Sequence, residues 1–344
     1  MAGDVPDRER GPFDPQQGAD DDLWFLPAAE DLSVDLPPGP RAGQRRLFDP
    51  AEWRAAQGAL AAELAQVGLR FGMLDERLAG MGEGALRRLA LREVADLSWW
   101  TGDRIGVDRL ALWIAARAGA AAEDTPALAR AGWAVRRLTI GTGPCREAGQ
   151  GGWRTGIAAF LGRDGDAVAE VAEAMAGLAG LHPVVEAAVL FHAWLLASSG
   201  PAATVEAAVL AARHAATMAR GAALFLPLAM SGVSGLTASG SAERRLALWL
   251  TGAEQATLSA LAQLDRLRIW EARARTATAD LSGRTPPRLV AALVAWPALS
   301  APMAEEVTGA SRAAVQRNLD SLAARGLVRE ITGQGRFRMW AAAT

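Results

Sequence analysis

The chain of 344 residues contains no tyrosine and a single cysteine, Cys145. One cysteine excludes a disulfide within the chain, so we expect the protein in the reducing cytoplasm. Lysine is also absent, and all 36 basic residues are therefore arginines, which stay charged and bind phosphate or guanine through a planar fork. Apart from three histidines, every cationic contact with a partner must come from arginine.

Long apolar runs are also missing. The N-terminus lacks a basic segment followed by an apolar one, the pattern of a secretory signal. The longest uncharged stretch, 221–242, contains Pro227 and several serines and glycines, whereas a membrane span is continuously apolar. We therefore predict no membrane partner, and we expect a buried helix end followed by a loop in this stretch.

The net charge is only −2, but the charge is unevenly distributed. Residues 1–44 hold ten acidic residues and three arginines, a net charge of −7, and are rich in Asp, Pro and Gly. This composition predicts a disordered acidic tail. Residues 284–344 hold eight arginines and four acidic residues, a net charge of +4. The basic end of the chain is therefore the first place to look for a polyanion site.

Residues 45–281 show no alternating strand pattern, and their apolar residues recur at helical spacing. Asp49-Pro50 suits the start of the first helix, with Asp as the N-cap and Pro in the first turn. A later segment predicts a helix over 203–224. We therefore predict a mainly α protein with an all-helical body. Its large apolar anchors, which fill the core or alternatively line a ligand pocket, are predicted to be Trp99, Trp100, Trp113, Trp194, Trp249 and Trp270.

The segment 284–344 has a different order of elements. A first helix begins at a proline pair, which suits a first turn, and ends before the next proline, which cannot continue it. A second, short helix over 301–307 is predicted to bury Met303 and Val307, and a tight turn at 308–310 follows it. The pattern thus predicts two helices that are separated from a third by a turn.

The third helix, 312–325, carries the clearest signal in the chain. Ser311 suits its N-cap, as Ser300 suits the N-cap of the preceding helix, and Gly326 suits its left-handed end. Apolar residues at positions i, i+4 and i+7 predict one buried face of this helix. They are Val315, Leu319 and Leu322.

Beyond Gly326 the period of the apolar pattern changes from 3.6 to 2. Residues 327–331 and 336–340 predict two strands around a glycine turn at 332–335, with Arg336, Arg338 and Trp340 on one face. Helix, helix, turn, helix and a two-stranded wing is the order of a winged helix-turn-helix domain, which we predict for residues 284–344.

The outward face of the third helix is the predicted DNA-binding surface. A helix of this kind fits the major groove, where Arg recognises guanine and Gln recognises adenine, while the free N–H groups at its start suit a phosphate. The predicted contacts are Ser311, Arg312, Ala313, Gln316, Arg317 and Asn318 on the helix, and Arg336 and Arg338 on the wing.

Double-stranded DNA is therefore the predicted partner. One module with a few phosphate contacts binds weakly at physiological salt, so we also predict a homodimer that reads two half-sites. A second hypothesis is a protein–protein adaptor whose winged helix docks a protein partner. Asp320 and the pair Glu305-Glu306, predicted to face water, favour this second hypothesis because they repel phosphate.

Two stretches of the body, 71–78 and 88–95, resemble the N-terminal helical region of Fic-type proteins. From about residue 50 onward, the chain resembles an uncharacterised α-proteobacterial group, found in rhizobia and often on plasmids. Members of this group pair a Fic-related helical region with a C-terminal helix-turn-helix, and the best match lies in 329–340. The resemblance implies a Fic-like body that carries a DNA-binding domain.

The sequence departs from the Fic pattern at the residues that carry the chemistry. Fic nucleotidyl transferases use a His-Pro-Phe-x-x-Gly-Asn-Gly-Arg loop, but here His182-Pro183 precedes an apolar segment without the phosphate cradle. Thr101 also stands where the inhibitory motif of the family has glutamate. The resemblance therefore implies a catalytically inactive body for dimerisation, partner binding or ligand sensing. A remnant Fic-type nucleotidyl transferase is the third hypothesis.

Other chemistry has little support. His182, His192 and His214 are the only histidines, and Glu186, four residues after His182, is the one carboxylate placed to join a metal site. Cys145 has no base beside it in sequence, and the glycine-rich residues 141–152 match no phosphate-cradling pattern. We predict no enzymatic activity and no catalytic, cofactor or metal site. The predicted function is a DNA-binding transcriptional regulator.

Overall fold

The computed structural model describes residues 48–116, 124–144, 152–219, 221–332 and 338–344. Leu47–Thr344 form one compact unit. The predicted acidic tail, 1–44, lies outside the described residues, and the predicted boundary between the body, 45–281, and the C-terminal segment, 284–344, stays a prediction.

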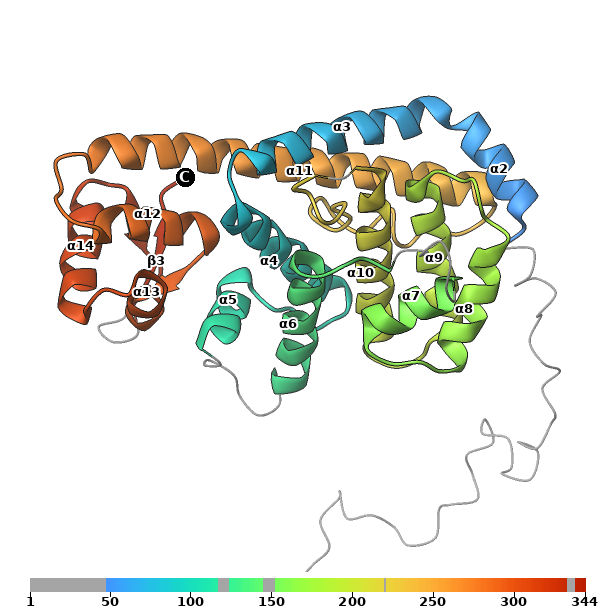
Figure 1. Cartoon of the computed structure of the whole chain (residues 1–344), viewed down its shortest axis with the longest axis horizontal. Coiled ribbons are helices and arrows are strands. Elements are labelled where there is room, and N and C mark those ends of the chain that lie inside the picture. Colours follow the sequence, from blue (N-terminus) through green and yellow to red (C-terminus); the bar gives the residue numbers. More distant parts are fainter. Residues whose placement is uncertain (1–47, 117–123, 145–151, 220, 333–337) are drawn as a thin grey trace, which may run out of the picture. The chain divides into compact units, whose positions relative to one another are not determined.

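The described chain is mainly α-helical, with a small antiparallel sheet near its C-terminus (Figure 1). The helices are α2 (Pro50–Ala59), α3 (Ala61–Ala79), α4 (Glu83–Trp100), α5 (Val107–Ala116), α6 (Thr125–Thr139), α7 (Gly152–Leu161), α8 (Asp166–Ala176), α9 (Pro183–Ala197), α10 (Ala203–Ala215), α11 (Ala242–Ala277), α12 (Thr285–Ala295), α13 (Ala301–Thr308) and α14 (Arg312–Ala324). The strands are β1 (Leu299–Ser300), β2 (Val328–Glu330) and β3 (Met339–Ala342).

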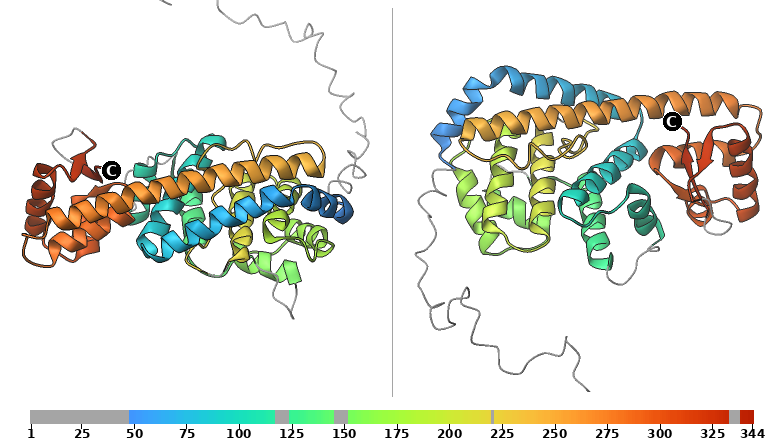
Figure 2. Two further views of the ribbon diagram at one scale, coloured as in Figure 1. Left: turned by 90° about the horizontal axis from the view of Figure 1, so that it is seen from above. Right: turned by 180° about the vertical axis from the view of Figure 1, so that it is seen from behind.

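Helices α2 to α11 form the helical body. Its centre is the antiparallel pair α9 and α10, and α9 is buried on nearly all sides because its sequence is apolar all round. The 36-residue helix α11 lies alongside α2 and α3 and continues past them to the C-terminal segment (Figure 2). As predicted, Asp49 caps α2, since its carboxylate accepts a hydrogen bond from the N–H of Ala51 at 2.8 Å.

Two predictions for the body were wrong in part. The helix predicted over 203–224 ends at Ala215, and a 3-10 turn, Ala216–Met218, follows it. Residues 221–241 contain no helix and are mostly buried only over 223–230, so the loop expected within 221–242 is present but the helix end expected there is not. Trp99 is 59% exposed and does not anchor the core. Trp194, Trp249 and Trp270 are buried as predicted, and so is Trp53.

Two acidic side chains support this irregular segment. Buried backbone N–H groups need partners, and here carboxylates supply them. Oε1 of Glu93, on α4, accepts hydrogen bonds from the N–H groups of Leu228 and Ala229 at 2.8 and 2.9 Å. Oδ1 of Asp75, on α3, accepts one from the N–H of Ala223 at 2.7 Å. These long-range contacts explain how a loop is held inside the helical body.

In the C-terminal segment, three helices are followed by two strands, and the sheet has the order β1-β3-β2. The hydroxyl groups of Ser300 and Ser311 cap α13 and α14 as predicted, and Gly326 has a left-handed φ of 66°. The predicted buried face of α14 is confirmed, because Val315, Leu319 and Leu322 are each 0% exposed.

Other details of this segment differ from the prediction. Val307 is 46% exposed, while Ala304 and Thr308 join Met303 on the buried face of α13. The last strand extends to Ala342, beyond the predicted end at residue 340, because β3 is central and pairs with both β1 and β2. The predicted turn at 332–335 lies mostly outside the described residues.

The first helix of this segment packs directly on α4 of the body. Gly84 permits the approach: a Cβ atom at this position would lie 2.9 Å from Cβ of Ala295. Nη1 of the buried Arg88 donates hydrogen bonds to the carbonyl oxygens of Leu293 and Trp296 at 2.8 and 2.9 Å. These carbonyls lie at and just past the end of α12, where no intrahelical N–H satisfies them, so Arg88 acts as a C-terminal cap from another helix.

Candidate nucleic-acid interface

Helix α14 presents one face to solvent at the edge of the molecule (Figure 1). Its buried stripe packs on α12, α13 and β2. On the outward side, Ser311, Arg312, Ala313 and Arg317 are exposed, and Gln316 and Asn318 are partly exposed. All six residues predicted from this helix are therefore at least partly accessible, but Gln316 and Asn318 lie on opposite flanks of the exposed face.

The turn before α14 fixes the direction of this helix. Gly309 ends α13 with a left-handed φ of 63°, which a side chain would strain. Nη1 of Arg288 donates to the carbonyl oxygen of Thr308 at 2.7 Å, and Oγ1 of Thr308 accepts from the N–H of Ala310 at 3.3 Å. With Ser311 capping the next helix, the polar groups of this turn have partners and hold α13 and α14 at a set angle.

The polar side chains on α14 are not equally available to a partner. The Arg312 side chain is 80% exposed, and its Nε lies 4.0 Å from a Glu305 carboxylate oxygen, too far for a strong pair. Arg317 is exposed and has no polar partner among the described residues. The Gln316 amide donates to Asp320 at 2.9 Å. Arg312 and Arg317 are therefore the freest donors.

The remaining amide and the wing residues are more constrained. Nδ2 of Asn318 donates to the carbonyl oxygen of Ala314 at 2.8 Å, one turn back along α14. Nε of Arg338 donates to the Glu330 carboxylate at 2.8 Å, and its guanidinium lies 5.1 Å from the centre of the Trp340 ring. The charge of Arg338 is thus locally balanced. Arg336 lies outside the described residues.

Sequence reasoning missed Arg329, which lies on β2 and is exposed between buried Val328 and half-buried Glu330. Its signal was the strand alternation itself, which places Arg329 opposite the core-facing side chains. Like Arg317, Arg329 has no carboxylate partner within 4 Å among the described residues. This arginine adds a positive charge to the outer face of the sheet.

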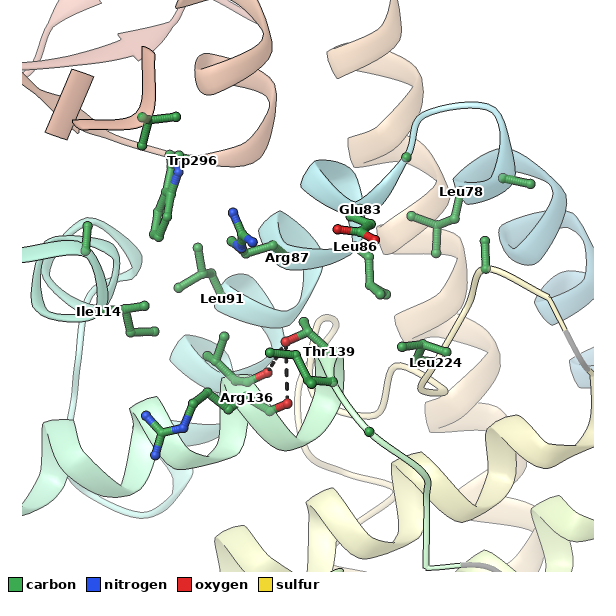
Figure 3. Close-up of a pocket in the computed structure, with 18 of the residues that line it drawn as sticks. Leu78, Glu83, Leu86, Arg87, Leu91, Ile114, Arg136, Thr139, Leu224 and Trp296 are labelled. Atoms are coloured by element: carbon green, nitrogen blue, oxygen red, sulfur yellow. Dashed lines mark hydrogen bonds between the residues drawn. The ribbon is translucent and has the colours of Figure 1, made fainter. Parts of the chain in front are cut away.

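A second candidate site is a groove of about 1020 Å³ between the helical body and the C-terminal segment. Figure 3 shows the side chains that line this groove, which include residues of α4, α6 and the loop at Leu224 on the side of the body and Trp296 on the side of the C-terminal segment. The Arg87 guanidinium lies 5.3 Å from the centre of the Trp296 ring, a cation–π contact that joins the two parts. Val307 and Ile140 line the same groove, which explains why these apolar side chains are exposed.

The histidines lie in separate environments. Nδ1 of His182 accepts from the N–H of Val184 at 3.2 Å and caps α9. His214 pairs with Glu186 at 2.8 Å, so this carboxylate serves a different histidine from the one suggested by spacing. His192 is buried, and burial, with the charge of Arg245, lowers its pKa to about 4. Within the described ranges, no group of three His, Cys, Asp or Glu side chains could hold a metal ion.

In the described part of the chain, no helix is both long and apolar enough to span a bilayer. Comparisons with known protein families and with curated proteins find no match for this chain. The resemblance to Fic-type proteins and to the α-proteobacterial group therefore stays a prediction.

Proposed function

We propose that this protein is a DNA-binding transcriptional regulator that uses a C-terminal winged helix-turn-helix domain. In this proposal α12, α13 and α14 are the three helices of the domain, and the sheet supplies the wing. The order of elements, with the short β1 between the first and second helices, supports it. So does the short turn, centred on Gly309, that separates α13 from α14.

The observation that carries the proposal is the exposed face of α14. Arg312 and Arg317 project from a helix whose opposite face is held by three fully buried side chains. A helix that is fixed to the domain core along one face can enter the major groove as a rigid body. Arg312 and Arg317 lie in its first two turns, the part of such a helix that comes nearest to the bases. Arg317 is the proposed guanine contact, through a bidentate pair with O6 and N7.

The start of α14 is the proposed phosphate contact. Ser311 and the first N–H groups of the helix combine donors with the positive end of the helix dipole, and Arg312 adds a full charge. Arg329, on the outer face of β2, is a further proposed phosphate contact. A single domain with so few contacts binds weakly, so the proposed active form is a dimer on half-sites about 34 Å apart.

The groove between the body and the C-terminal segment suits a regulatory role for the body. Its volume of about 1020 Å³ is of the size that holds a small molecule. A ligand there would touch α4 and α6 of the body and Trp296 and Val307 of the C-terminal segment at once. Such a ligand would couple the state of the body to the DNA-binding domain.

One observation favours an adaptor function instead. The pairing of Arg338 with Glu330, and the position of Asp320 beside Gln316, reduce the positive charge around α14. A surface that docks a protein needs less positive charge than one that binds DNA. The two functions differ in their dependence on salt, since binding to DNA releases counterions from the phosphates and weakens steeply as salt rises.

The proposal is tested by selecting bound sequences from random DNA with the full-length chain, followed by filter binding of the selected sequence at two salt concentrations. Arg317→Ala is expected to weaken binding by about 5- to 150-fold, or about 1–3 kcal/mol, and to relax the preference at one base pair. The matched control is Arg244→Ala, an exposed arginine at the start of α11. No enrichment from the random pool at low salt, or equal loss in both variants, contradicts the proposal.

A further inference from the structure

A small polar cleft lies between α4 and α11, apart from the groove of Figure 3 and from the exposed face of α14. Its volume is about 180 Å³. Five of the lining side chains that come from α4 and α11 can donate hydrogen bonds, and three of these are guanidinium groups. They are Arg88 and Arg92 from α4, and Ser259, Gln263 and Arg266 from α11.

The positive charge of this cleft exceeds the negative charge around it. Arg92 pairs with Asp96 at 2.7 Å. Neither Arg88 nor Arg266 has a carboxylate within 4 Å in the part of the chain that the structure describes. Guanidinium groups that share so small a space repel one another, which costs free energy. An anion bound between them offsets this repulsion.

The buried member of the set has an unused donor. The Arg88 residue is only 8% exposed, and burial lowers its pKa to about 10, so its guanidinium remains charged at neutral pH. Its Nη1 is taken by the two carbonyl groups at the end of α12. Its Nε has no hydrogen-bond partner among the described residues. A buried charge whose donors are only partly satisfied is costly, and the Arg88 side chain lines the cleft, so an anion in the cleft would lie beside this buried charge and offset part of that cost.

The size and chemistry of the cleft define the class of ligand. Pockets for drug-sized molecules span roughly 300–1000 Å³, so this cleft suits a group of only a few atoms. The Ser259 hydroxyl already donates to the carbonyl oxygen of Met230 at 3.1 Å, and Nε of Arg92 donates to Asp96. The donors left for a ligand are the Arg266 guanidinium, the remaining N–H groups of Arg92 and the Gln263 amide, beside the buried charge of Arg88. Several forked donors converging on a small space match a tetrahedral oxyanion.

We propose that this cleft binds a phosphate group, either as free inorganic phosphate or as a phosphomonoester, held by Arg88, Arg92 and Arg266. Because Arg88 also caps α12, the bound anion stabilises the attachment of the C-terminal segment to the body. The site thus links the concentration of a small anion to the position of that segment. This inference does not depend on DNA binding and stands if the proposed function fails.

The test is calorimetric titration of the full-length chain with inorganic phosphate at constant ionic strength. Arg266→Gln is the test variant, because Arg266 is exposed and its loss leaves the core intact. Arg268→Gln, two residues further along α11 and also exposed, is the matched control outside the cleft. We expect saturable binding to the parent and to the control, and at least tenfold weaker binding to Arg266→Gln. Glycerol 3-phosphate, titrated in parallel, distinguishes a phosphomonoester from free phosphate by which of the two binds more tightly.

Two outcomes overturn the proposal. In the first, phosphate and an equal ionic strength of chloride have the same effect on the parent, which means that no specific site exists. In the second, Arg266→Gln binds phosphate as tightly as the parent, which means that the cleft does not hold the anion.

Discussion

The pH dependence of folding isolates the contribution of Glu93, the carboxylate that supports the buried loop. This side chain is fully buried on α4, and desolvation raises its pKa to about 7 even though the N–H groups of Leu228 and Ala229 lower it. The negative charge of Asp96 acts in the same direction as burial. In the unfolded chain Glu93 has an ordinary pKa near 4.5.

The difference between the pKa of Glu93 in the folded chain and in the unfolded chain sets the sign and the size of the change in stability with pH. Between pH 4.5 and 7 the folded state holds a proton on Glu93 that the unfolded state releases, so stability falls as the pH rises through this window. One pKa unit corresponds to about 1.4 kcal/mol, and the full difference therefore amounts to about 3 kcal/mol. The loss is complete once the pH exceeds the pKa in the folded state.

His192 makes stability depend on pH in the opposite direction over much of the same pH range. Its pKa is lowered from 6.5 to about 4, chiefly by burial and further by Arg245. As the pH falls from 6.5 to 4, the unfolded state takes up a proton that the folded state refuses, so stability rises with pH over this window. In the chain with its own sequence, called the parent here, the effects of Glu93 and His192 on stability offset each other. The free energy of unfolding of the parent is therefore expected to change little between pH 4.5 and 6.5.

Urea unfolding of the parent and of Glu93→Gln, measured from pH 4.5 to 7.5, separates the two effects. The glutamine keeps an oxygen that can accept from Leu228 and Ala229, and any cost of its amide is independent of pH. Relative to the parent, Glu93→Gln should therefore gain about 3 kcal/mol between pH 4.5 and 7.5. The exposed Glu52→Gln, on α2, is the control and should follow the parent. A difference between Glu93→Gln and the parent that stays constant with pH would refute the reasoning.

Two further predictions concern packing. Leu319→Ala removes a fully buried side chain from α14 and should lower the free energy of unfolding by about 2–5 kcal/mol, measured with urea; a loss below 1 kcal/mol would mean that this face is loosely packed. Gly84→Ala places a Cβ atom 2.9 Å from Ala295 and should destabilise the contact of α4 with α12 by about 1–3 kcal/mol in thermal unfolding. Gly72→Ala, in α3 with nothing within 4 Å of the new Cβ atom, is its control and should stabilise the chain by about 0.5–1 kcal/mol; a loss of stability there would argue against the assigned helix.

Much of the exposed face of α14 was predictable because its signals are local. The helical period of Val315, Leu319 and Leu322 identifies the buried face, and the outward positions of Arg312 and Arg317 follow from geometry alone. N-cap serines and a terminal glycine act within one turn of the helix that they delimit. The engagement of neighbouring polar side chains, such as Gln316 with Asp320, depends on rotamers that a sequence pattern does not specify.

Periodicity predicted less well where a helix meets more than one neighbour. Val307 continues the apolar pattern of α13 but faces the groove, because the packing of this helix against α12 buries Ala304 and Thr308 instead. The helix expected to reach residue 224 ends at Ala215, since the chain turns there into the loop that Glu93 and Asp75 hold from α4 and α3.

The sequence alone determined the mainly helical character, the charge asymmetry and the buried face and caps of α14, because period, caps and turn residues act over a few neighbouring positions. Only the tertiary structure decided which groups Glu93 and Arg88 bind, because their hydrogen-bond partners lie 135 to 208 residues away in the sequence. It also brought three arginines from α4 and α11 to one cleft. No local pattern records which helix faces which, because that choice depends on how whole apolar surfaces fit together in the folded chain.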